Sequence, residues 1–412
     1  MEKTITPSRY FFLILILGSL TALGPFSIDM YLPGFPAMAK DFGTDVAAVG
    51  FSLTSFFIGI SAGQLLYGPL LDRFGRKRPL FIGLALYILA SIGCMYAHTI
   101  NTLIIVRFIQ AIGSCAATVA AMAMVRDLFP VKDNAKVFSL LLLVVGASPM
   151  IAPTVGGYVT SAFGWASVFL ILTIMGAVLL LSCILWLPES YEPDTMMSLK
   201  PKPIINNFLS VVREPQFYTY AFTGGVAFSS LLAYVSGSPQ VFMKIYHVND
   251  KTYGWIFALL AMGFIGSSQV NSLLLRRFRS QDIIPVALCG QLLFGVLMVL
   301  GTMNNIIGMY GLIALLFLYL CCLGLVNPNA AALSLAPFER NAGSASALMG
   351  ALQLGLGALT SAFVSYFDTP TALPLSATMA GSALLATLIL FTGRRNIRGA
   401  VTQSSAAAGV LH

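Results

Sequence analysis

Long uncharged apolar runs alternate with short polar breaks along almost the whole chain of 412 residues. A helix needs about 20 consecutive apolar residues to cross the hydrocarbon core of a bilayer. Breaks that contain Pro, Gly, Asn or charge separate the runs. The pattern predicts an all-α membrane protein with twelve transmembrane helices, near residues 10–32, 46–71, 79–98, 102–126, 136–160, 165–187, 216–238, 252–275, 283–302, 306–328, 342–366 and 372–393.

The longest polar break lies between the sixth and seventh runs and is rich in proline. It divides the chain into two halves of six helices. We therefore expect an N-terminal half over 1–187, a cytoplasmic central loop over 188–215, a C-terminal half over 216–394 and a disordered cytoplasmic tail over 395–412.

Composition and charge fit this picture. The chain is 58% hydrophobic and only 9% charged, whereas about 25% charged residues are usual in soluble domains. Nineteen Lys and Arg residues fall on one side of the predicted spans and three on the other. Basic loops stay in the cytoplasm, so we expect a multi-pass protein of the inner (plasma) membrane with both termini cytoplasmic. The net charge of +8 then reflects topology, and no nucleic-acid partner is expected.

Little in the sequence favours an enzyme. The six cysteines lie in apolar stretches without metal-ligand spacing, and the three histidines are scattered. We expect no metal, no cofactor and no catalytic residues, because neither a nucleophile–base pair nor a ligand cluster is present. A channel is also disfavoured, because it would not need two matching halves.

Three motifs carry more specific information. The loop after the second run reads "GPLLDRFGRKRPL" and includes Gly68, Asp72, Arg73, Gly75 and Arg76. A weaker version, "NSLLLRRFRSQD", occupies the same place in the second half. Gly68 would let a neighbouring helix approach, Asp72 would meet the positive end of a helix, and Gly75 would allow a tight turn.

The other two motifs lie within runs four and five. "RFIQAIGS" places Arg107, Gln110 and Ser114 on one helix face, which should look at polar space. "GASPMIAPTVGGY" contains two prolines and two adjacent glycines. The prolines should bend the helix or weaken its backbone hydrogen bonds. These four are Pro149, Pro153, Gly156 and Gly157.

Together these motifs resemble those of the major facilitator superfamily. The loop after run two matches its signature at nearly every position, and the run-five motif resembles its antiporter signature, with Ala152 and Ser148 in place of two glycines. With "IDMYLPGFPAMAKDFG", "MVRDLFP" and "SGSPQVFMKIYHV", the chain is similar to the Bcr/CflA subfamily of drug:H+ antiporters over nearly its whole length.

This resemblance implies a proton-driven, monomeric exporter of small amphipathic drugs such as bicyclomycin, chloramphenicol-type or sulfonamide antibiotics. It would use the lipid bilayer and protons as partners and no cofactor. A proton-coupled solute symporter or a metabolite exporter on the same fold remains the alternative.

Asp29 and Arg107 are the candidate proton-coupling residues. A charge at mid-membrane costs about 2.5–3.5 kcal/mol, and helices one and four line the central cavity of the superfamily fold. Burial favours the neutral carboxyl group and a nearby guanidinium favours the charged one. Asp29 would therefore exchange a proton while Arg107 tunes it. A static Asp29–Arg107 salt bridge is the simpler reading.

Helices two and eleven carry stripes of small residues, which let helices approach closely: Ser55–Gly59–Gly63 and Gly343–Ala347–Ala351–Gly355. The resemblance implies that these two helices meet between the halves. The resemblance further places Asp72 near the start of helix eleven and near Arg126, as a latch of the cytoplasmic side. A loop salt bridge without a gating role is the alternative.

Polar or aromatic residues within the spans are candidates for a mixed substrate pocket. Each alone is more often a packing residue. They are Tyr31, Gln64, Gln110, Phe228, Tyr234, Gln269, Asn271, Asn327 and Gln353.

Overall fold

The computed structural model describes residues 7–129, 131–194, 201–338 and 342–397, and within these ranges it is helical. All twelve predicted spans are helices of the described chain. They are α1 (Pro7–Asp29), α3 (Val46–Phe74), α4 (Lys77–Met95), α5 (Ile100–Leu128), α6 (Val131–Phe163), α7 (Ala166–Trp186), α9 (Pro215–Pro239), α10 (Asp250–Leu274), α11 (Ser280–Met303), α12 (Met309–Leu335), α13 (Ala342–Tyr366) and α14 (Leu373–Gly393).

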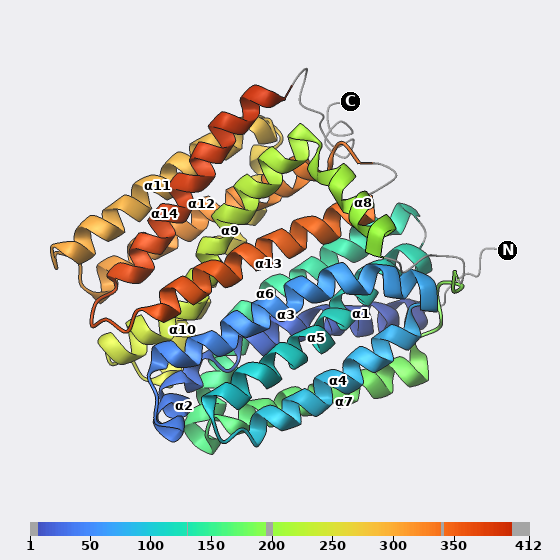
Figure 1. The fold of residues 1–412 in the computed structure, drawn as a ribbon, viewed down its shortest axis with the longest axis horizontal. Helices are drawn as coiled ribbons and strands as arrows, with labels where there is room; N and C mark the ends of the chain where they lie inside the picture. Colours follow the sequence, from blue (N-terminus) through green and yellow to red (C-terminus); the bar gives the residue numbers. More distant parts are fainter. Residues whose placement is uncertain (1–6, 130, 195–200, 339–341, 398–412) are drawn as a thin grey trace.

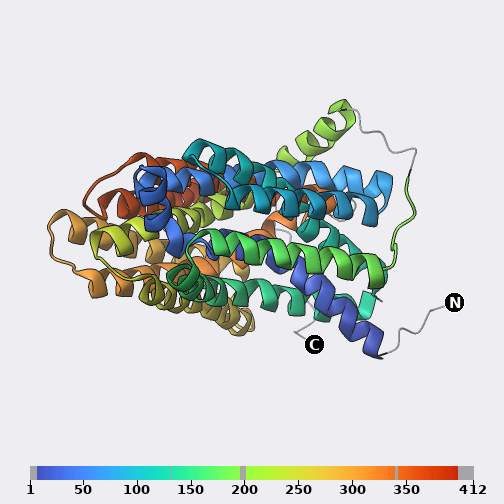
Figure 2. The same ribbon diagram turned by 90° about the horizontal axis from the view of Figure 1, so that it is seen from below.

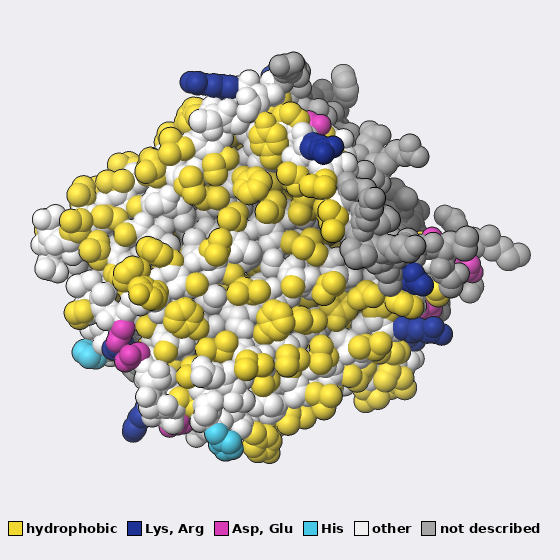
Figure 3. Space-filling model, in the orientation of Figure 1, with side chains coloured by type: hydrophobic (Ala, Val, Ile, Leu, Met, Phe, Trp, Pro, Cys, Tyr) yellow, Lys and Arg dark blue, Asp and Glu magenta, His cyan; other side chains and the backbone are white. Residues whose placement is uncertain are grey.

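Eleven stretches of the described chain are long and apolar enough to cross a membrane. The predicted span not among them is α9, which carries many hydroxyl side chains. Neighbouring helices rather than lipid surround it, because Thr219, Thr223, Ser230 and Ser238 are fully buried. Figure 3 shows the complementary outer surface, on which apolar side chains cover the middle and charged ones lie near the rim.

The helices form two side-by-side groups, α1–α7 and α9–α14 (Figures 1 and 2). The central segment, expected as a loop, contains a further helix, α8 (Pro201–Val212). Of the expected tail, residues 395 and 396 belong to a short 3-10 turn (Arg394–Asn396) after α14, Ile397 follows it, and 398–412 lie outside the described residues.

The end of the first span differs from the prediction. The regular helix α1 stops at Asp29 instead of continuing to residue 32. The ring of Pro33 would clash with the carbonyl of Asp29, four residues earlier, so the helix cannot continue. The chain instead forms a 3-10 turn (Leu32–Gly34) and the short helix α2 (Phe35–Phe42). We call this end of the molecule the α2 end, and the opposite end, which carries the loop between α3 and α4, the signature end.

One seam between the halves is formed by α3 and α13. The hydroxyls of Thr54 and Ser361 lie 2.7 Å apart, and Ser61 Oγ donates to the carbonyl of Ala351 at 2.8 Å. The expected helix pair is therefore confirmed, but the expected face of α3 is wrong. Gly59 and Gly63 pack against α5 within the same half, where their missing side chains make room for Ala111 and Cys115.

The second seam is formed by α6 and α10, and it is tight at the α2 end. A Cβ on Gly254 would lie 2.8 Å from Thr154 Cα, and one on Gly157 would collide with the carbonyl of Asp250. Farther along α10 toward the signature end, a Cβ on Gly266 would meet no heavy atom within 4 Å. The described contacts thus close this second seam at the α2 end.

Candidate functional site

Arg107 lies at the centre of a buried polar network inside the first half. Its side chain is fully buried, and its two terminal nitrogens donate to Gln110 Oε1 at 2.5 Å and to the carbonyl of Ser27 at 2.9 Å. Gln110 in turn donates to Ser91 Oγ at 2.7 Å, and the hydroxyls of Ser27 and Tyr87 lie 2.7 Å apart. The polar face predicted on α5 thus faces α1 and α4.

Aromatic rings enclose the guanidinium. Its central carbon lies 4.2 Å from the ring centre of Tyr31 and 4.1 Å from that of Phe56. A desolvated cation–π contact is worth about 2 kcal/mol, so the rings replace part of the hydration that burial removes. Arg107 is fixed by neutral partners, and no Asp29–Arg107 ion pair is present among the described residues.

Asp29 lies beside this network but points elsewhere. Arg107 holds the carbonyl of Ser27, two residues before Asp29, so the two charged groups share one depth. Asp29 is only 4% exposed, and no described hydrogen bond or ion pair reaches its carboxylate. It interacts electrostatically with Tyr234 on α9 and Tyr253 on α10, across the seam. A buried carboxylate without a partner is costly as an anion, which makes Asp29 suited to binding a proton.

The glycine signature of α6 packs directly around the end of α1. A Cβ on Gly156 would collide with the carbonyl of Met30, the residue after Asp29, and Gly157 touches Asp250 at the start of α10. Small residues permit close approach of helices, and these two glycines lie where α6 meets α1 and α10. Pro149 and Pro153 lie inside α6, which continues as one helix through both. The signature brings α1, α6 and α10 together next to Asp29.

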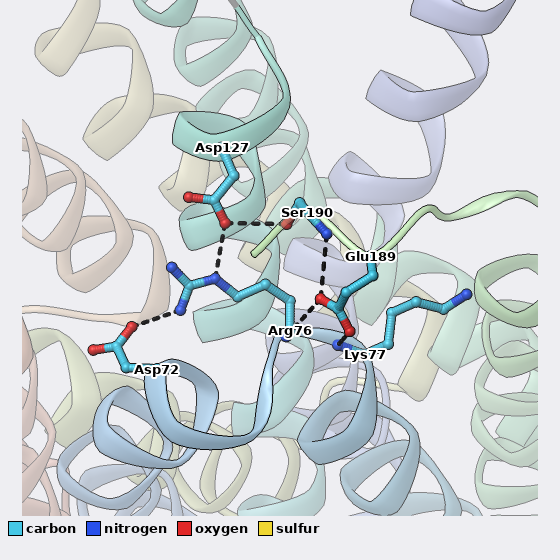
Figure 4. Close-up of polar contacts among 6 residues, drawn as sticks. All are labelled: Asp72, Arg76, Lys77, Asp127, Glu189 and Ser190. Carbon is cyan, nitrogen blue, oxygen red and sulfur yellow. Dashed lines mark hydrogen bonds and ion pairs between the residues drawn. The ribbon is translucent and has the colours of Figure 1, made fainter. Parts of the chain in front are cut away.

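A second charged cluster occupies the signature end (Figure 4). Arg76 pairs with Asp72 at 2.6 Å and with Asp127, at the end of α5, at 2.8 Å. Burial opposes the charge of Arg76, but the hydrogen bonds and charges of Asp127 and Asp72 outweigh it and raise the pKa of Arg76. The pairs tie α3 to α5.

The segment that follows α7 completes this cluster. The Glu189 carboxylate accepts from the backbone N–H of Arg76 at 2.8 Å and of Lys77 at 3.2 Å, so it caps the start of α4 (Figure 4). The ring of Tyr191 lies 4.2 Å from the Arg76 guanidinium. An anion at a helix N-terminus is favourable. We expected Asp72 in such a role, and in this structure Glu189 fills it at α4.

The remaining predicted residues at the signature end agree with their predicted roles only in part. Gly75 has φ +80°, which confirms the tight turn, whereas no helix approaches Gly68 in this structure. The Arg73 guanidinium lies 5.7 Å from the Phe74 ring centre, and that of Arg126 lies 5.9 Å from the Phe138 ring centre. The predicted latch stays a prediction, because part of the α13 start, residues 339–341, lies outside the described residues.

The predicted pocket residues separate into three groups. Tyr31 and Gln110 are buried within the Arg107 network. Tyr234 is buried at the seam near Asp29, whereas Asn271 is buried and accepts from Asn329 at 2.6 Å. The remaining five are partly or fully exposed, and among them Gln353 donates to Asn327 at 3.1 Å. These five are Gln64, Phe228, Gln269, Asn327 and Gln353.

Several residues of these sites were not predicted. Asp127 lies within the quoted "MVRDLFP" and Glu189 at the start of the central loop, and their place directly after a span was the available signal. The hydroxyls of Tyr253 and Ser238 lie 2.8 Å apart. Ser238 falls within the quoted "SGSPQVFMKIYHV" and Tyr253 in no quoted motif, and neither was singled out. Their role depends on how α9 and α10 pack, which the sequence does not state.

Known proteins with similar sequences are transporters. An "Uncharacterized MFS-type transporter YdgK" of Bacillus subtilis (strain 168) is 33% identical over 92% of this chain and 94% of its own length. A "Bicyclomycin resistance protein homolog" of Haemophilus influenzae is 29% identical over 94% and 98% of the two chains. The "Multidrug resistance protein MdtL" of Klebsiella pneumoniae is 29% identical over 82% and 84%. These relatives are consistent with the Bcr/CflA branch.

Solved structures show the same fold. A D-xylose–proton symporter matches with a TM-score of 0.72 at 17% identity, over 93% of this chain and 97% of that one. A bacterial homologue of the human lysosomal transporter Spinster, in an inward-facing and occupied conformation, matches with a TM-score of 0.73 at 13% identity, over 95% and 98%. The family model of the Major Facilitator Superfamily matches residues 17–362. The chain is a membrane transporter, not an enzyme, and it belongs to the major facilitator superfamily.

Proposed function

We propose that this transporter exports small amphipathic drugs in exchange for protons, with Asp29 as the proton carrier. The observation that carries the proposal is the position of Asp29. The apolar stretch Tyr10–Phe42, which includes both α1 and α2, holds Asp29 well inside its ends. Among the described stretches long and apolar enough to cross a membrane, no other acid lies more than one helical turn from an end. Asp29 is buried without a bonded partner, and ionisable groups in that setting mark ion pathways.

Two further observations support export rather than uptake. The glycine signature of α6, which resembles that of antiporters, packs against the chain next to Asp29. Relatives named for bicyclomycin and multidrug resistance match most of the chain. The proposed orientation places the signature end, with its basic loops, in the cytoplasm. The protein would work as a monomer in the inner membrane.

A drug-susceptibility panel in an efflux-deficient bacterial host tests this function. Bicyclomycin, chloramphenicol and a sulfonamide are compared in cells with the wild type, Asp29→Asn or an empty vector. We expect the wild type to raise the inhibitory concentration of at least one drug and Asp29→Asn to match the vector at equal expression. Full proton-coupled transport by Asp29→Asn in proteoliposomes would refute the role of Asp29.

The alternative is a solute:proton symporter, favoured only by the shared fold of the D-xylose–proton symporter. The direction of substrate transport distinguishes the exporter from the symporter. A labelled substrate accumulates less in cells that express an exporter and more in cells that express a symporter.

A further inference from the structure

Tyr234 has a buried hydroxyl that no described group satisfies. Its side chain is 1% exposed, and the hydroxyl has no partner at hydrogen-bond geometry. The nearby Ser238 interacts with it, but the Ser238 hydroxyl pairs with that of Tyr253 at 2.8 Å. An orphaned buried hydroxyl costs about 1–3 kcal/mol, so such a group is expected to bond in another state of the protein or through water. Asp29 is its complement, because the carboxylate has acceptor positions and no described donor.

The seam geometry brings these two groups together. Gly156 touches the residue after Asp29, and its neighbour Gly157 touches Asp250, three residues before Tyr253. The ring of Phe257 lies 5.4 Å from that of Tyr234 and 6.1 Å from that of Tyr253. The end of α1 therefore faces an aromatic group of the second half, and Asp29 interacts electrostatically with both tyrosines.

The other ionisable groups around Asp29 are already engaged or lie at the rim. Arg107 on α5 donates to Gln110 and Ser27, and the Tyr253 hydroxyl pairs with Ser238. On its own segment, the Tyr31 hydroxyl lies 3.1 Å from Ser52.

At the α2 end, Asp250 begins α10. Lys251 Nζ lies 5.3 Å from the ring centre of Tyr158 on α6. Two of these groups are buried donors with unused capacity, Tyr234 Oη and Arg107 Nε. Of the two, Tyr234 is the one that interacts electrostatically with Asp29.

We propose that, when the α2 end is closed, the Tyr234 hydroxyl donates a hydrogen bond to a water molecule that bridges it to the Asp29 carboxylate across the seam. The inference rests on the proposed function and assigns Tyr234 as a positioning residue for proton exchange. A donor stabilises the charged form of the acid, so the closed state favours release of the proton toward the signature end.

Opening the α2 end reverses this preference. When the halves separate there, Tyr234 on α9 leaves Asp29 on α1, and the carboxylate loses its donor. Asp29 then binds a proton more tightly, on the side predicted to be external. This alternation has the direction that proton-driven export needs, namely uptake of the proton outside and release inside.

An infrared pH titration of the purified protein in lipid nanodiscs tests the inference without a transported substrate. The band of the protonated carboxyl group is assigned to Asp29 by its loss in Asp29→Asn. Tyr234→Phe removes only the hydroxyl, and Tyr220→Phe is the matched control. Tyr220 lies on the same helix, fully buried and equally without a hydroxyl partner, and 14 residues, or about 21 Å, away along α9.

We expect Tyr234→Phe to move the titration midpoint about one to two pH units higher and Tyr220→Phe to leave it unchanged. An unchanged midpoint in Tyr234→Phe, an equal shift in both variants, or no Asp29 band in the wild type would overturn the inference. These outcomes differ from failure of the proposed function, which is loss of drug resistance or indifference of transport to Asp29→Asn.

Discussion

Replacing Gly157 with alanine should open the seam between α6 and α10 at the α2 end. The added methyl group would collide with the carbonyl oxygen of Asp250 and lie 3.0 Å from its carbonyl carbon and 3.4 Å from Lys251 Cα. These obstacles are backbone atoms of the other half, so no side-chain rotation relieves the overlap. The strain therefore acts on the closed state and disappears when the halves separate.

The size of the effect follows from the cost of overpacking. An extra methylene in a tightly packed site costs about 1–3 kcal/mol. If the whole cost falls on the closed state, the ratio of open to closed molecules rises about 5- to 150-fold. Gly266→Ala is the matched control, because Gly266 lies on the same helix, α10, next to Ile265, which lies close to Gly146 of α6, and a methyl at Gly266 meets nothing within 4 Å.

Alkylation of a buried reporter cysteine measures this ratio. Ser365→Cys, in a variant whose native cysteines are replaced, places a thiol where the side chain is 4% exposed and faces Ser236 and Gly50. Its reaction with a maleimide should accelerate 5- to 150-fold in Gly157→Ala, in proportion to the open population. Equal rates in Gly157→Ala and the parent, or equal acceleration by Gly266→Ala, would refute the reasoning.

Three further changes have definite expected outcomes. Arg107→Lys keeps the charge but loses the planar fork that holds two acceptors, so drug transport in proteoliposomes should fall at least about tenfold, or about 1.4 kcal/mol, at normal membrane levels. Thr54→Val removes the cross-half bond to Ser361 and should favour opening by about 1 kcal/mol, seen as faster alkylation of the same reporter. Glu189→Gln weakens the cap on α4 and should lower stability by about 0.5–1 kcal/mol, measured as a lower thermal unfolding midpoint beside an unchanged Glu192→Gln control.

The number and order of the spans could be predicted because each apolar run must cross the same thickness of lipid. The end of α1 could not be placed from hydropathy, since residues 30–39 remain uncharged and mostly apolar after the helix stops. Pro33 was the signal, through its clash with the carbonyl of Asp29. The stripe on α3 failed for a different reason. Spacing by four residues identifies a face that permits close approach, and it does not say whether α5 or α13 occupies it.

The candidate site could be predicted only in part, because spacing along a helix does not show which neighbour each side chain faces. Counting residues from the span ends placed Asp29 and Arg107 at one depth, and the bond from Arg107 to Ser27 agrees with that. The depth of a residue in the membrane does not determine how its helix is rotated about its own axis. The residue count therefore did not reveal that the side chains of Asp29 and Arg107 point toward different neighbours. The cluster around Arg76 includes Glu189, which lies more than a hundred residues farther along the chain. Only the folded structure shows that this segment lies next to Arg76.

The two halves share a buried polar arrangement but differ in charge. Gln110 and Tyr319 each stand ten residues after the first residue of α5 and α12. Gln110 bonds Ser91 in the first half, and Tyr319 donates to the carbonyl of Met379 at 2.7 Å in the second.

Seven residues into the same helices, Arg107 in the first half corresponds to Leu316, which is fully buried, in the second. Both helices therefore carry a buried polar side chain at the first of these positions, and only α5 carries a charge at the second. The proton site is therefore expected to depend on the first half for its carboxylate and guanidinium. The second half contributes neutral donors such as Tyr234, whose distance from Asp29 changes as the halves rock. A charge on both sides of the seam would attract or repel in every state, whereas a neutral donor favours the ionised acid only while the seam is closed.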